Sequence, residues 1–276
     1  MAVSPVAQAD AIEAAAYRDL VAAAPAAIRR ETGARASELA GATLLIAPGA
    51  PLPLFNRVIG LGMHQPAQER HLDAAIAEYR RSGCAEFWVH VSPGSQPAEL
   101  PRWLETRGLA PPQRKSWAKM LRGRVAPPEI DTRLQVRRAL PGDGGRIGTM
   151  ICAAYGLPAP FAEWFDALPS RPRWRAHVAL EDARIVAAGF LFLDDTRAWL
   201  GAAGTLSEFR RRGAQGALMA RRISDAIEVG CTVIATETGE PVGDEPNPSL
   251  QNMRRCGFEQ VASRLNYACR FAGQVR

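Results

Sequence analysis

The sequence predicts an α+β protein, and two observations lead to that class. Short apolar strands alternate with amphipathic helices along most of the 276 residues. A basic turn that contains glycine, at 208–216, follows a small-residue strand and continues directly into a helix that Gly230 closes. An apolar content of 47% in a chain of this length is enough for the cores of one large or two ordinary domains.

The first half is expected to begin with two Ala-rich helical pieces within 7–30, which separate near Pro25 and carry no side chain of chemical interest. Alternating and amphipathic patterns predict the elements that follow. These are strands at 42–47, 55–62, 86–91 and 116–121, and helices at 68–81 and 99–106. The segment 122–132 contains a Pro-Pro pair and reads as a linker between domains.

The second half is expected to begin with a strand and two helices, followed by a hairpin whose turn lies at 181–184. Its predicted elements are a strand at 134–140, helices at 144–155 and 161–168, strands at 177–181, 185–193 and 198–206, a helix up to Gly230, a strand at 232–236, a helix at 249–255 and a strand at 258–269. The second half therefore reads strand, two helices, three strands, helix, strand, helix, strand.

Composition excludes several classes of protein. No run of about 18 apolar residues occurs, and the first twenty residues lack the pattern of a secretory signal. Five scattered cysteines, with no Cys-x-x-Cys pair and no Cys/His cluster, indicate reduced thiols in a cytoplasmic protein and no metal site. The net charge of +6 is spread over arginines without a stripe of interleaved aromatics, so nucleic-acid binding is not favoured.

The turn at 208–216 has the features of an anion site. The first backbone N–H groups of a helix have no internal partner, and the helix dipole adds about half a positive charge there. Three successive arginines, Arg210 to Arg212, raise the local positive potential. No Lys-Ser or Lys-Thr follows the glycines and no Gly-x-Gly-x-x-Gly is present, so the common nucleotide loops do not fit. A phosphate or pyrophosphate is the expected guest, and an ordinary basic helix start is the alternative.

The run Arg210-Arg211-Arg212-Gly213-Ala214-Gln215 resembles the pyrophosphate turn of the GNAT superfamily, the acyl-coenzyme A-dependent N-acetyltransferases. The pattern of that family is Arg/Gln-x-x-Gly-x-Gly/Ala. Gln215 departs from it at the last place, and Gly216 comes one position late. The order of elements in the second half is also the GNAT order.

A second segment, 247–258, is similar to a late Asn…Gly-Phe segment of the same family. Asn247 and the pair Gly257-Phe258 match, whereas Met253 stands where many members carry the tyrosine that protonates the leaving thiolate. The resemblance covers 134–270, roughly half of the chain. It implies the GNAT fold, a central mixed and mostly antiparallel sheet between two layers of helices.

The first half looks like a worn repeat of the same unit. The segment 83–89 (GCAEFWV) resembles 230–235 (GCTVIA), and each follows a long helix and precedes a short one. The helix expected at 68–81 has no arginine-glycine turn before it, and Pro66 removes a backbone donor. We therefore expect two GNAT-like lobes, a degenerate one at 1–125 and an acetyl-coenzyme A-binding one at 126–276. An unrelated α+β domain is the alternative for the first.

The resemblance assigns acetyl-coenzyme A to the backbone at the end of the strand 198–206, to the basic turn, and to the helix start at Asn247. The implied contacts are Ala203, Gly204, Thr205, Leu206, Arg210, Arg211, Arg212, Gly213, Ala214, Gln215, Gly216 and Asn247. Gly204 could equally mark a simple β-bulge. Asn247 could serve only as a helix N-cap, and one or more of the arginines could point to solvent.

The resemblance implies transfer of an acetyl group to a primary amine of an unidentified small molecule or peptide. Glu237 is the expected general base, because it follows a buried strand where the family opens its sheet; Glu240 is the second choice. With Met253 in place of the tyrosine, the thiolate leaves unassisted, or Ser249 or Tyr155 substitutes.

Two questions stay open at this point. Trp164 and Trp174 could line the acceptor pocket or pack in the core. A non-catalytic acyl-coenzyme A-binding or sensing protein is the alternative to an enzyme. The sequence is compatible with a monomer or a homodimer.

Overall fold

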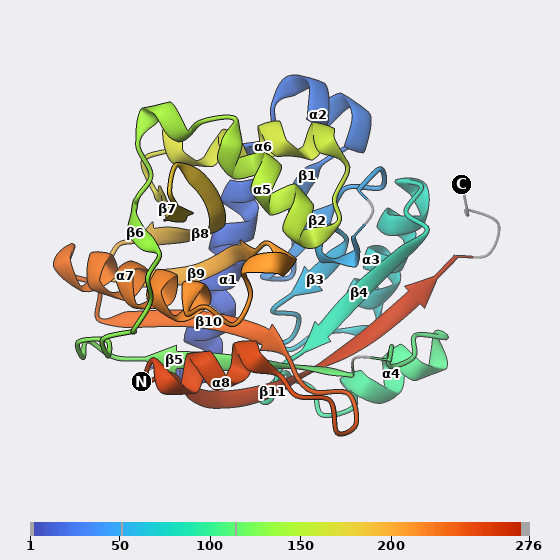
Figure 1. Cartoon of the computed structure of the whole chain (residues 1–276). Helices are drawn as coiled ribbons and strands as arrows, with labels where there is room; N and C mark the ends of the chain where they lie inside the picture. Colours follow the sequence, from blue (N-terminus) through green and yellow to red (C-terminus); the bar gives the residue numbers. More distant parts are fainter. Residues whose placement is uncertain (1–2, 51, 114, 272–276) are drawn as a thin grey trace.

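The computed structural model describes residues 3–50, 52–113 and 115–271. Its strands form an eleven-stranded sheet in the order β1-β2-β3-β4-β11-β5-β10-β9-β8-β7-β6 (Figure 1). Most neighbouring strands run antiparallel, and helices cover both faces. The predicted α+β class with a mixed, mostly antiparallel sheet is confirmed.

The elements of the first half agree with the sequence patterns, except that β1 was not expected and the strand expected at 55–62 is confined to Arg57–Ile59. They are α1 (Pro5–Ala22), α2 (Ala26–Thr32), β1 (Arg35–Leu39), β2 (Ala42–Ile46), β3 (Arg57–Ile59), α3 (Glu69–Arg81), β4 (Glu86–Val91), α4 (Leu100–Thr106) and β5 (Ser116–Arg122). The sequence analysis missed β1. This strand lies at the edge of the sheet and exposes nearly all of its side chains, so it has no alternating apolar pattern.

The second half follows the predicted order throughout. Its elements are β6 (Gln135–Arg138), α5 (Arg146–Tyr155), α6 (Ala162–Asp166), β7 (Trp174–Glu181), β8 (Arg184–Asp194), β9 (Arg197–Thr205), α7 (Ala214–Glu228), β10 (Val233–Gly239), α8 (Pro248–Arg255) and β11 (Glu259–Arg270). Gly230, at φ +93°, follows the end of α7 in the left-handed conformation that commonly terminates a helix.

The two halves of the sheet repeat one pattern of strand pairing. In the first half, β1, β2 and β3 are antiparallel neighbours, and β4 returns through α3 to lie parallel to β3. In the second half, β7, β8 and β9 are antiparallel neighbours, and β10 returns through α7 to lie parallel to β9. A short helix and one more strand then end each half, α4 with β5 and α8 with β11.

The last strand of each half pairs with the other half. β5 lies between β10 and β11, and β11 lies between β4 and β5 (Figure 1). Each half therefore completes its own series of strands with a strand from the other. The linker expected at 122–132 follows β5, and the sheet is continuous across the halves that it joins.

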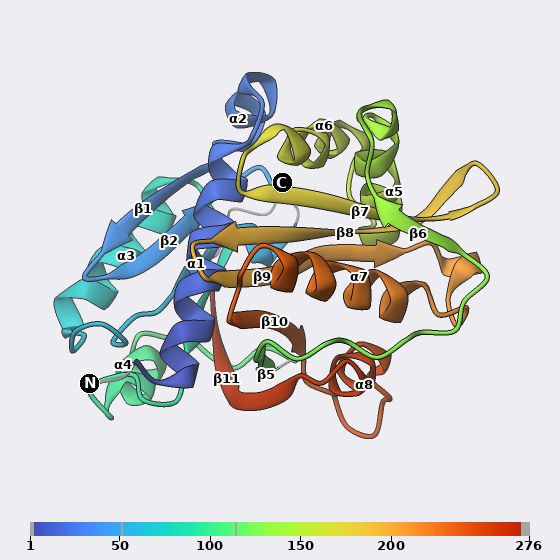
Figure 2. The same ribbon diagram turned by 90° about the vertical axis from the view of Figure 1, so that its left-hand side faces the viewer.

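Side-chain alternation in the strands separates two layers of helices. Phe190 and Phe192 of β8 pack in the core that α1, α2, α5 and α6 cover, whereas Leu191 packs in the core beneath α7 and α8. In the first half, Leu45 of β2 faces α1 and its neighbour Leu44 faces α3 and α4. Helix α1 crosses the middle of the sheet and contacts strands of both halves (Figure 2).

Candidate functional site

The parallel strands β9 and β10 separate part of the way along their length. Their pairing runs from Arg197↔Val233 to Leu200↔Thr236, where the Thr236 hydroxyl donates to the Leu200 carbonyl at 2.8 Å. Beyond this point β9 continues beside β8, and β10 continues beside β5. Residues 201–206 of the separated strand are all partly exposed. The sheet therefore opens between β9 and β10 beyond Leu200 and Thr236, and we refer to this opening as the cleft.

A β-bulge in β9 lies at the side of this cleft. Ala188↔Gly204 and Phe190↔Gly201 are successive pairs, so two residues of β9 lie opposite the single residue Gly189 of β8. The first of the two, Ala202, has φ +43°, and the carbonyl of the second, Ala203, accepts a hydrogen bond from the Tyr155 hydroxyl at 2.9 Å. The bulge thus interrupts the regular β8–β9 pairing beside the cleft.

Gly204 is required by close packing against α5. A Cβ at this position would lie 2.6 Å from the Cβ of Ala154, which is closer than such atoms approach in proteins. Gly204 pairs with Ala188 directly after the bulge. The glycine thus allows α5 to lie against the bulged end of β9, and it brings Tyr155 to the cleft.

The basic turn leads into α7 as predicted. Gly213, at φ +80°, is the N-cap, and a Cβ there would lie 2.8 Å from the Asp131 carbonyl oxygen. The N–H groups of Ala214, Gln215 and Gly216 have no acceptor within a helix, and none is recorded in the described part of the chain. Helix α7 therefore begins with unpaired positive backbone dipoles, next to the segment 130–132 that packs against Gly213 and Gly216.

The side chains of the turn have different roles. The Arg212 guanidinium pairs with Glu181 at 2.6 Å and is directed to the β7–β8 hairpin, whereas Arg210 and Arg211 are exposed. Gln215 joins α7 to α8, because its amide nitrogen donates to the Ser249 hydroxyl at 2.9 Å and its amide oxygen accepts from Asn252 at 2.7 Å. Gln215, which departs from the family pattern, thus fixes the start of α7 against α8.

Asn247 acts as the N-cap of α8. Its Oδ1 accepts from the Leu250 N–H at 2.9 Å, and its amide nitrogen donates to the Gly239 carbonyl at the end of β10. Beside it lies a cavity of about 340 Å³, which Thr238, Gly239 and Asn247 line together with Trp117 of β5. Asn247 therefore anchors the helix next to a cavity that continues from the end of β10.

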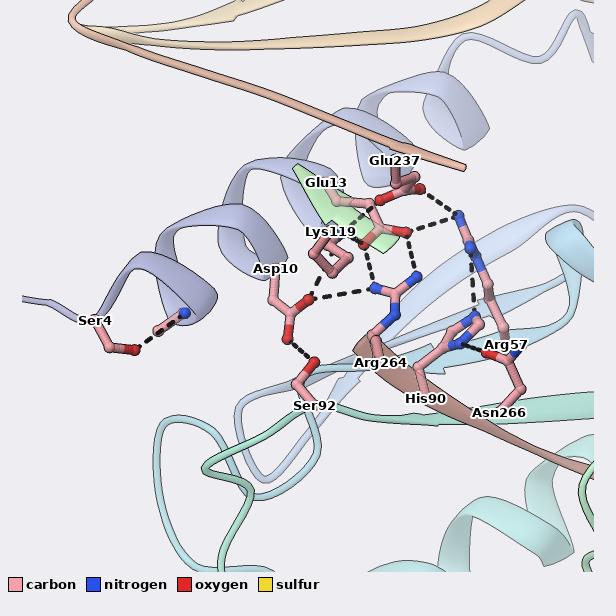
Figure 3. Close-up of polar contacts among 11 residues, drawn as sticks. Ser4, Asp10, Glu13, Arg57, His90, Ser92, Lys119, Glu237, Arg264 and Asn266 are labelled. Carbon is pink, nitrogen blue, oxygen red and sulfur yellow. Dashed lines mark hydrogen bonds and ion pairs between the residues drawn. The ribbon is translucent and has the colours of Figure 1, made fainter. Parts of the chain in front are cut away.

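Glu237 lies on β10 just past its last pair with β9, and its side chain is only 4% exposed (Figure 3). Its carboxylate contacts the Lys119 ammonium through one oxygen, and its other oxygen lies 3.9 Å from Arg57 Nη2. Burial, and next the charge of Glu13, raise the pKa of Glu237 to about 6. A carboxyl group with such a pKa can exchange a proton near neutral pH.

Glu237 belongs to a buried cluster of six charged side chains beneath α1 (Figure 3). The cluster has three acids and three bases: Asp10, Glu13, Arg57, Lys119, Glu237 and Arg264. Glu13 is its centre, because it pairs with all three cations. Although burial alone would raise it, the charges of Arg264, Lys119 and Arg57 hold the pKa of Glu13 well below its ordinary value.

The sequence patterns did not reveal this cluster, and the expectation that 7–30 carries no side chain of chemical interest was wrong. Asp10, Glu13 and Tyr17 follow one another at helical spacing on one face of α1. The available signal was the presence of two acids on the apolar face of α1, since a buried acid needs partners. Those partners come from β3, β5, β10 and β11, far apart in the sequence.

Other candidate residues are engaged in structural contacts. Glu240 accepts hydrogen bonds from Ser116, Gln260 and Ser263 at the edge of the β5–β11 pair. Trp164 and Trp174 are buried in the core, and their indole N–H groups donate to the Leu20 carbonyl and to Asp19. Met253, on α8, is likewise buried in the core that α7 and α8 form with the sheet.

The corresponding place in the first half is closed. The loop after β3 and the loop after β4 hydrogen-bond to each other, through Ala67 N–H to the Gln96 carbonyl at 2.7 Å and Gln96 N–H to the Gly62 carbonyl at 2.9 Å. A Cβ on Gly62, at φ +79°, would lie 2.4 Å from the Gln96 oxygen. The two loops thus pair with each other through their main chains beyond the β3–β4 pair.

Comparison with known proteins identifies the fold. No protein-family model and no curated protein matches the sequence. Among solved structures, a GCN5-related N-acetyltransferase from Kribbella flavida superposes with a TM-score of 0.65 and 17% identity, over 97% of this chain and 96% of that one. A tandem GNAT protein from the clavulanic acid biosynthesis pathway, solved without AcCoA, superposes with a TM-score of 0.59 and 13% identity, over 83% and 78% of the two chains.

A third structure, a GCN5-related N-acetyltransferase from Sphaerobacter thermophilus, has a TM-score of 0.58 and 17% identity, over 72% of this chain and 65% of that one. Together these likenesses show that the chain has the GNAT fold, as the two sequence motifs predicted. At such identities they show the fold alone.

Two further properties bear on possible ligands. Among the described residues, no helix is long and apolar enough to cross a membrane. The same part of the chain contains no group of three or more His, Cys, Asp or Glu side chains placed to hold a metal ion.

Proposed function

We propose that the protein is an N-acetyltransferase that moves the acetyl group of acetyl-coenzyme A to a primary amine of a small molecule or peptide. The observation that carries this proposal is the separation of β9 from β10 beside the unpaired N–H groups that begin α7. A pyrophosphate at Ala214 to Gly216 and a pantetheine arm along 203–206 would use both features. The closed loops of the first half support one cofactor site per chain, in the lobe 126–276, with 1–125 as a degenerate lobe.

The assigned chemistry uses the bulge and Glu237. The amine nitrogen attacks the thioester carbonyl, a C–N bond forms, the C–S bond breaks, and coenzyme A leaves as its thiolate. The amine proton goes to the Glu237 carboxylate, directly or through water. Backbone N–H groups at the bulged end of β9 are the candidates to stabilise the oxyanion. Ser249 and Tyr155 remain the candidate proton donors to the thiolate.

The second candidate function is a non-catalytic acyl-coenzyme A-binding protein. Two observations favour it: Met253 is part of the core, and Lys119 already pairs with the carboxylate of Glu237. An ionised base that is held by a lysine can act only if the incoming amine competes for it. Both candidates require the same cofactor site, so binding of acetyl-coenzyme A is tested first.

The test is calorimetric titration of the wild-type protein and the Gln215→Glu variant with acetyl-coenzyme A. The substitution is close to isosteric and places a carboxylate in the first turn of α7, which favours the free helix but repels a pyrophosphate. We expect one site per chain and a loss of affinity of about tenfold or more in the variant, which corresponds to about 1.4 kcal/mol.

Gln135→Glu is the matched control, because Gln135 is exposed on β6 and gains the same charge away from the cleft. Equal affinity in all three proteins would move the cofactor site elsewhere. No binding to the wild type would remove both candidate functions. Release of free thiol in the presence of an amine panel then separates the enzyme from the binding protein.

A further inference from the structure

Tyr17, on helix α1 of the first half, reaches the cleft of the second half. Its ring meets the Trp199 ring edge-to-face, with centroids 5.3 Å apart. The Trp199 ring in turn lies against Gly201, where any Cβ would overlap it at 1.7 Å. Since Gly201 directly precedes the bulge, Tyr17 lies one aromatic ring away from the bulged backbone of β9.

The other side of Tyr17 faces the buried charges. The Arg57 guanidinium lies over the Tyr17 ring, 4.1 Å from its centroid. Arg57 Nη2 also lies 3.9 Å from Glu237 Oε1, the carboxylate oxygen that does not contact Lys119. Burial raises the pKa of Tyr17 above its ordinary value although Arg57 opposes this, and the charges of Glu237 and Tyr155 add to the rise. Tyr17 therefore stays a neutral phenol, in contact with Trp199 and Arg57.

The four tyrosines of the chain differ in their exposure to solvent. Tyr79 and Tyr267 are buried, whereas Tyr17 is partly exposed and Tyr155 is 41% exposed. Ala202 and Ala154 pack at the edge of the same core as Tyr17. Two partly exposed tyrosines, one from each half of the chain, thus lie near the bulge on the face of the sheet that carries Glu237: Tyr155 contacts Ala203 directly, and Tyr17 contacts Trp199.

We propose that Tyr17 lines the acceptor side of the transfer site, so that the amine binds between a residue of the first half and the cleft of the second. This inference rests on the proposed function, because the bulge must hold the thioester. A phenol beside the base can accept a hydrogen bond from the amine and can orient its nitrogen toward the carbonyl carbon. The first half then completes the active site, although its own cleft is closed.

The test uses bromoacetyl-coenzyme A, which places an electrophilic carbon where the acetyl group would lie and needs no known acceptor. In Tyr17→Cys the new thiolate displaces bromide, a C–S bond forms, and the proton goes to solvent. Arg18→Cys is the matched control, because Arg18 is the exposed next residue of α1 and is directed to Thr43. Tyr155→Cys marks the other side of the bulge. All five native cysteines are buried, so the background is low.

We expect mass spectrometry to show alkylation of Tyr17→Cys at least tenfold faster than of Arg18→Cys, with suppression by coenzyme A. Equal rates, in variants that still bind acetyl-coenzyme A by calorimetry, would overturn the inference and leave the proposed function intact. No binding of acetyl-coenzyme A to the wild type would instead overturn the proposed function, and the inference with it.

A second measurement on the wild type covers the case in which Tyr17→Cys does not fold. Hydroxyl-radical footprinting with and without acetyl-coenzyme A compares Tyr17 and Tyr155, with the buried Tyr79 and Tyr267 as internal references. We expect the cofactor to reduce oxidation of both accessible tyrosines severalfold. Protection of Tyr155 alone would overturn the assignment of Tyr17.

Discussion

His90 and Glu237 occupy equivalent positions in the two halves of the chain. Each directly follows the last parallel pair of its strand, Val58↔Val89 for His90 and Leu200↔Thr236 for Glu237. Each also contacts a residue of the exchanged strand, since His90 Nδ1 lies 2.8 Å from Asn266 Oδ1 and Glu237 contacts Lys119.

The two equivalent residues, His90 and Glu237, differ in charge. Burial, and then the charges of Arg264 and Arg57, lower the pKa of His90 well below its ordinary value, so its imidazole is neutral. The half with the open cleft thus has a titratable carboxylate where the half with the closed loops has a neutral ring. This difference supports the proposal that Glu237 accepts the amine proton.

Replacing Glu237 by Gln is expected to lower turnover at least tenfold, because the amide cannot take up the amine proton. Affinity for acetyl-coenzyme A should stay within about twofold, since the α7 turn is unchanged. The measurement is thiol release with the best amine of the panel, beside calorimetry on the same preparation. Full turnover in the variant would rule out Glu237 as the base.

The pH profile of kcat/KM tests the same assignment on the wild type. The pKa of Glu237 is about 6, and only its ionised form accepts a proton. Activity should therefore be present above about pH 6 and fall about tenfold per pH unit below it. A profile that stays flat from pH 5 to pH 7 would contradict a role for this carboxylate.

Removing one charge from the buried cluster is expected to destabilise the fold more than removing a matched pair. Lys119→Met leaves Glu13 and Glu237 with an excess of negative charge, and we expect the free energy of unfolding to fall by about 3–5 kcal/mol. The double variant Lys119→Met/Glu237→Met keeps two acids and two bases and should recover at least half of that loss. Urea denaturation measures both. A double variant less stable than the single one would show that charge balance does not control this cluster.

The exchange of β5 and β11 predicts that neither half folds alone. A fragment 126–276 loses β5 from between β10 and β11, and with it the Lys119 partner of Glu237. We expect each fragment alone to be unfolded or aggregated by circular dichroism and gel filtration, and the co-expressed fragments 1–125 and 126–276 to form a one-to-one complex. A monomeric, cooperatively unfolding fragment 126–276 would contradict this prediction.

The five thiols are expected to be unreactive in the folded protein. All are buried, and burial raises the pKa of Cys84 and Cys152 to about 11, so little thiolate forms at pH 8. Ellman's reagent should detect no thiol within minutes under native conditions and five in denaturant. One rapidly reacting thiol in the native protein would identify a cysteine that the fold exposes.

Local patterns were enough to predict most of the fold. The glycine turn before α7, the hairpin β7–β8 and the amphipathic helix α3 each carry their signal within a few residues, and the structure contains all three. The edge strand β1 has no such signal. Which strand lies beside which is decided by tertiary packing, so the exchange of β5 and β11 was not predictable from spacing.

In the candidate site too, the parts that are contiguous in the sequence were predictable and the parts that meet only in the fold were not. The α7 turn was found because its glycine and its arginines are contiguous, whereas Glu13, Arg57 and Arg264 are separated by long stretches of sequence and meet only in the fold. The position of Tyr17 next to Trp199 and Arg57 was missed for the same reason, since nothing adjacent to it in the sequence marks it as a neighbour of these residues. Its neighbours come from β3 and β9.

The position of β11 also sets an order of events during synthesis on the ribosome. β4 emerges early, but its partner on one side is β11, which the ribosome completes only at residue 270. β5, in the middle of the finished sheet, likewise waits for both of its neighbours. The nascent chain must therefore keep a hydrophobic sheet edge unpaired through most of its translation, and a chaperone that shields strand edges would raise the yield of folded protein.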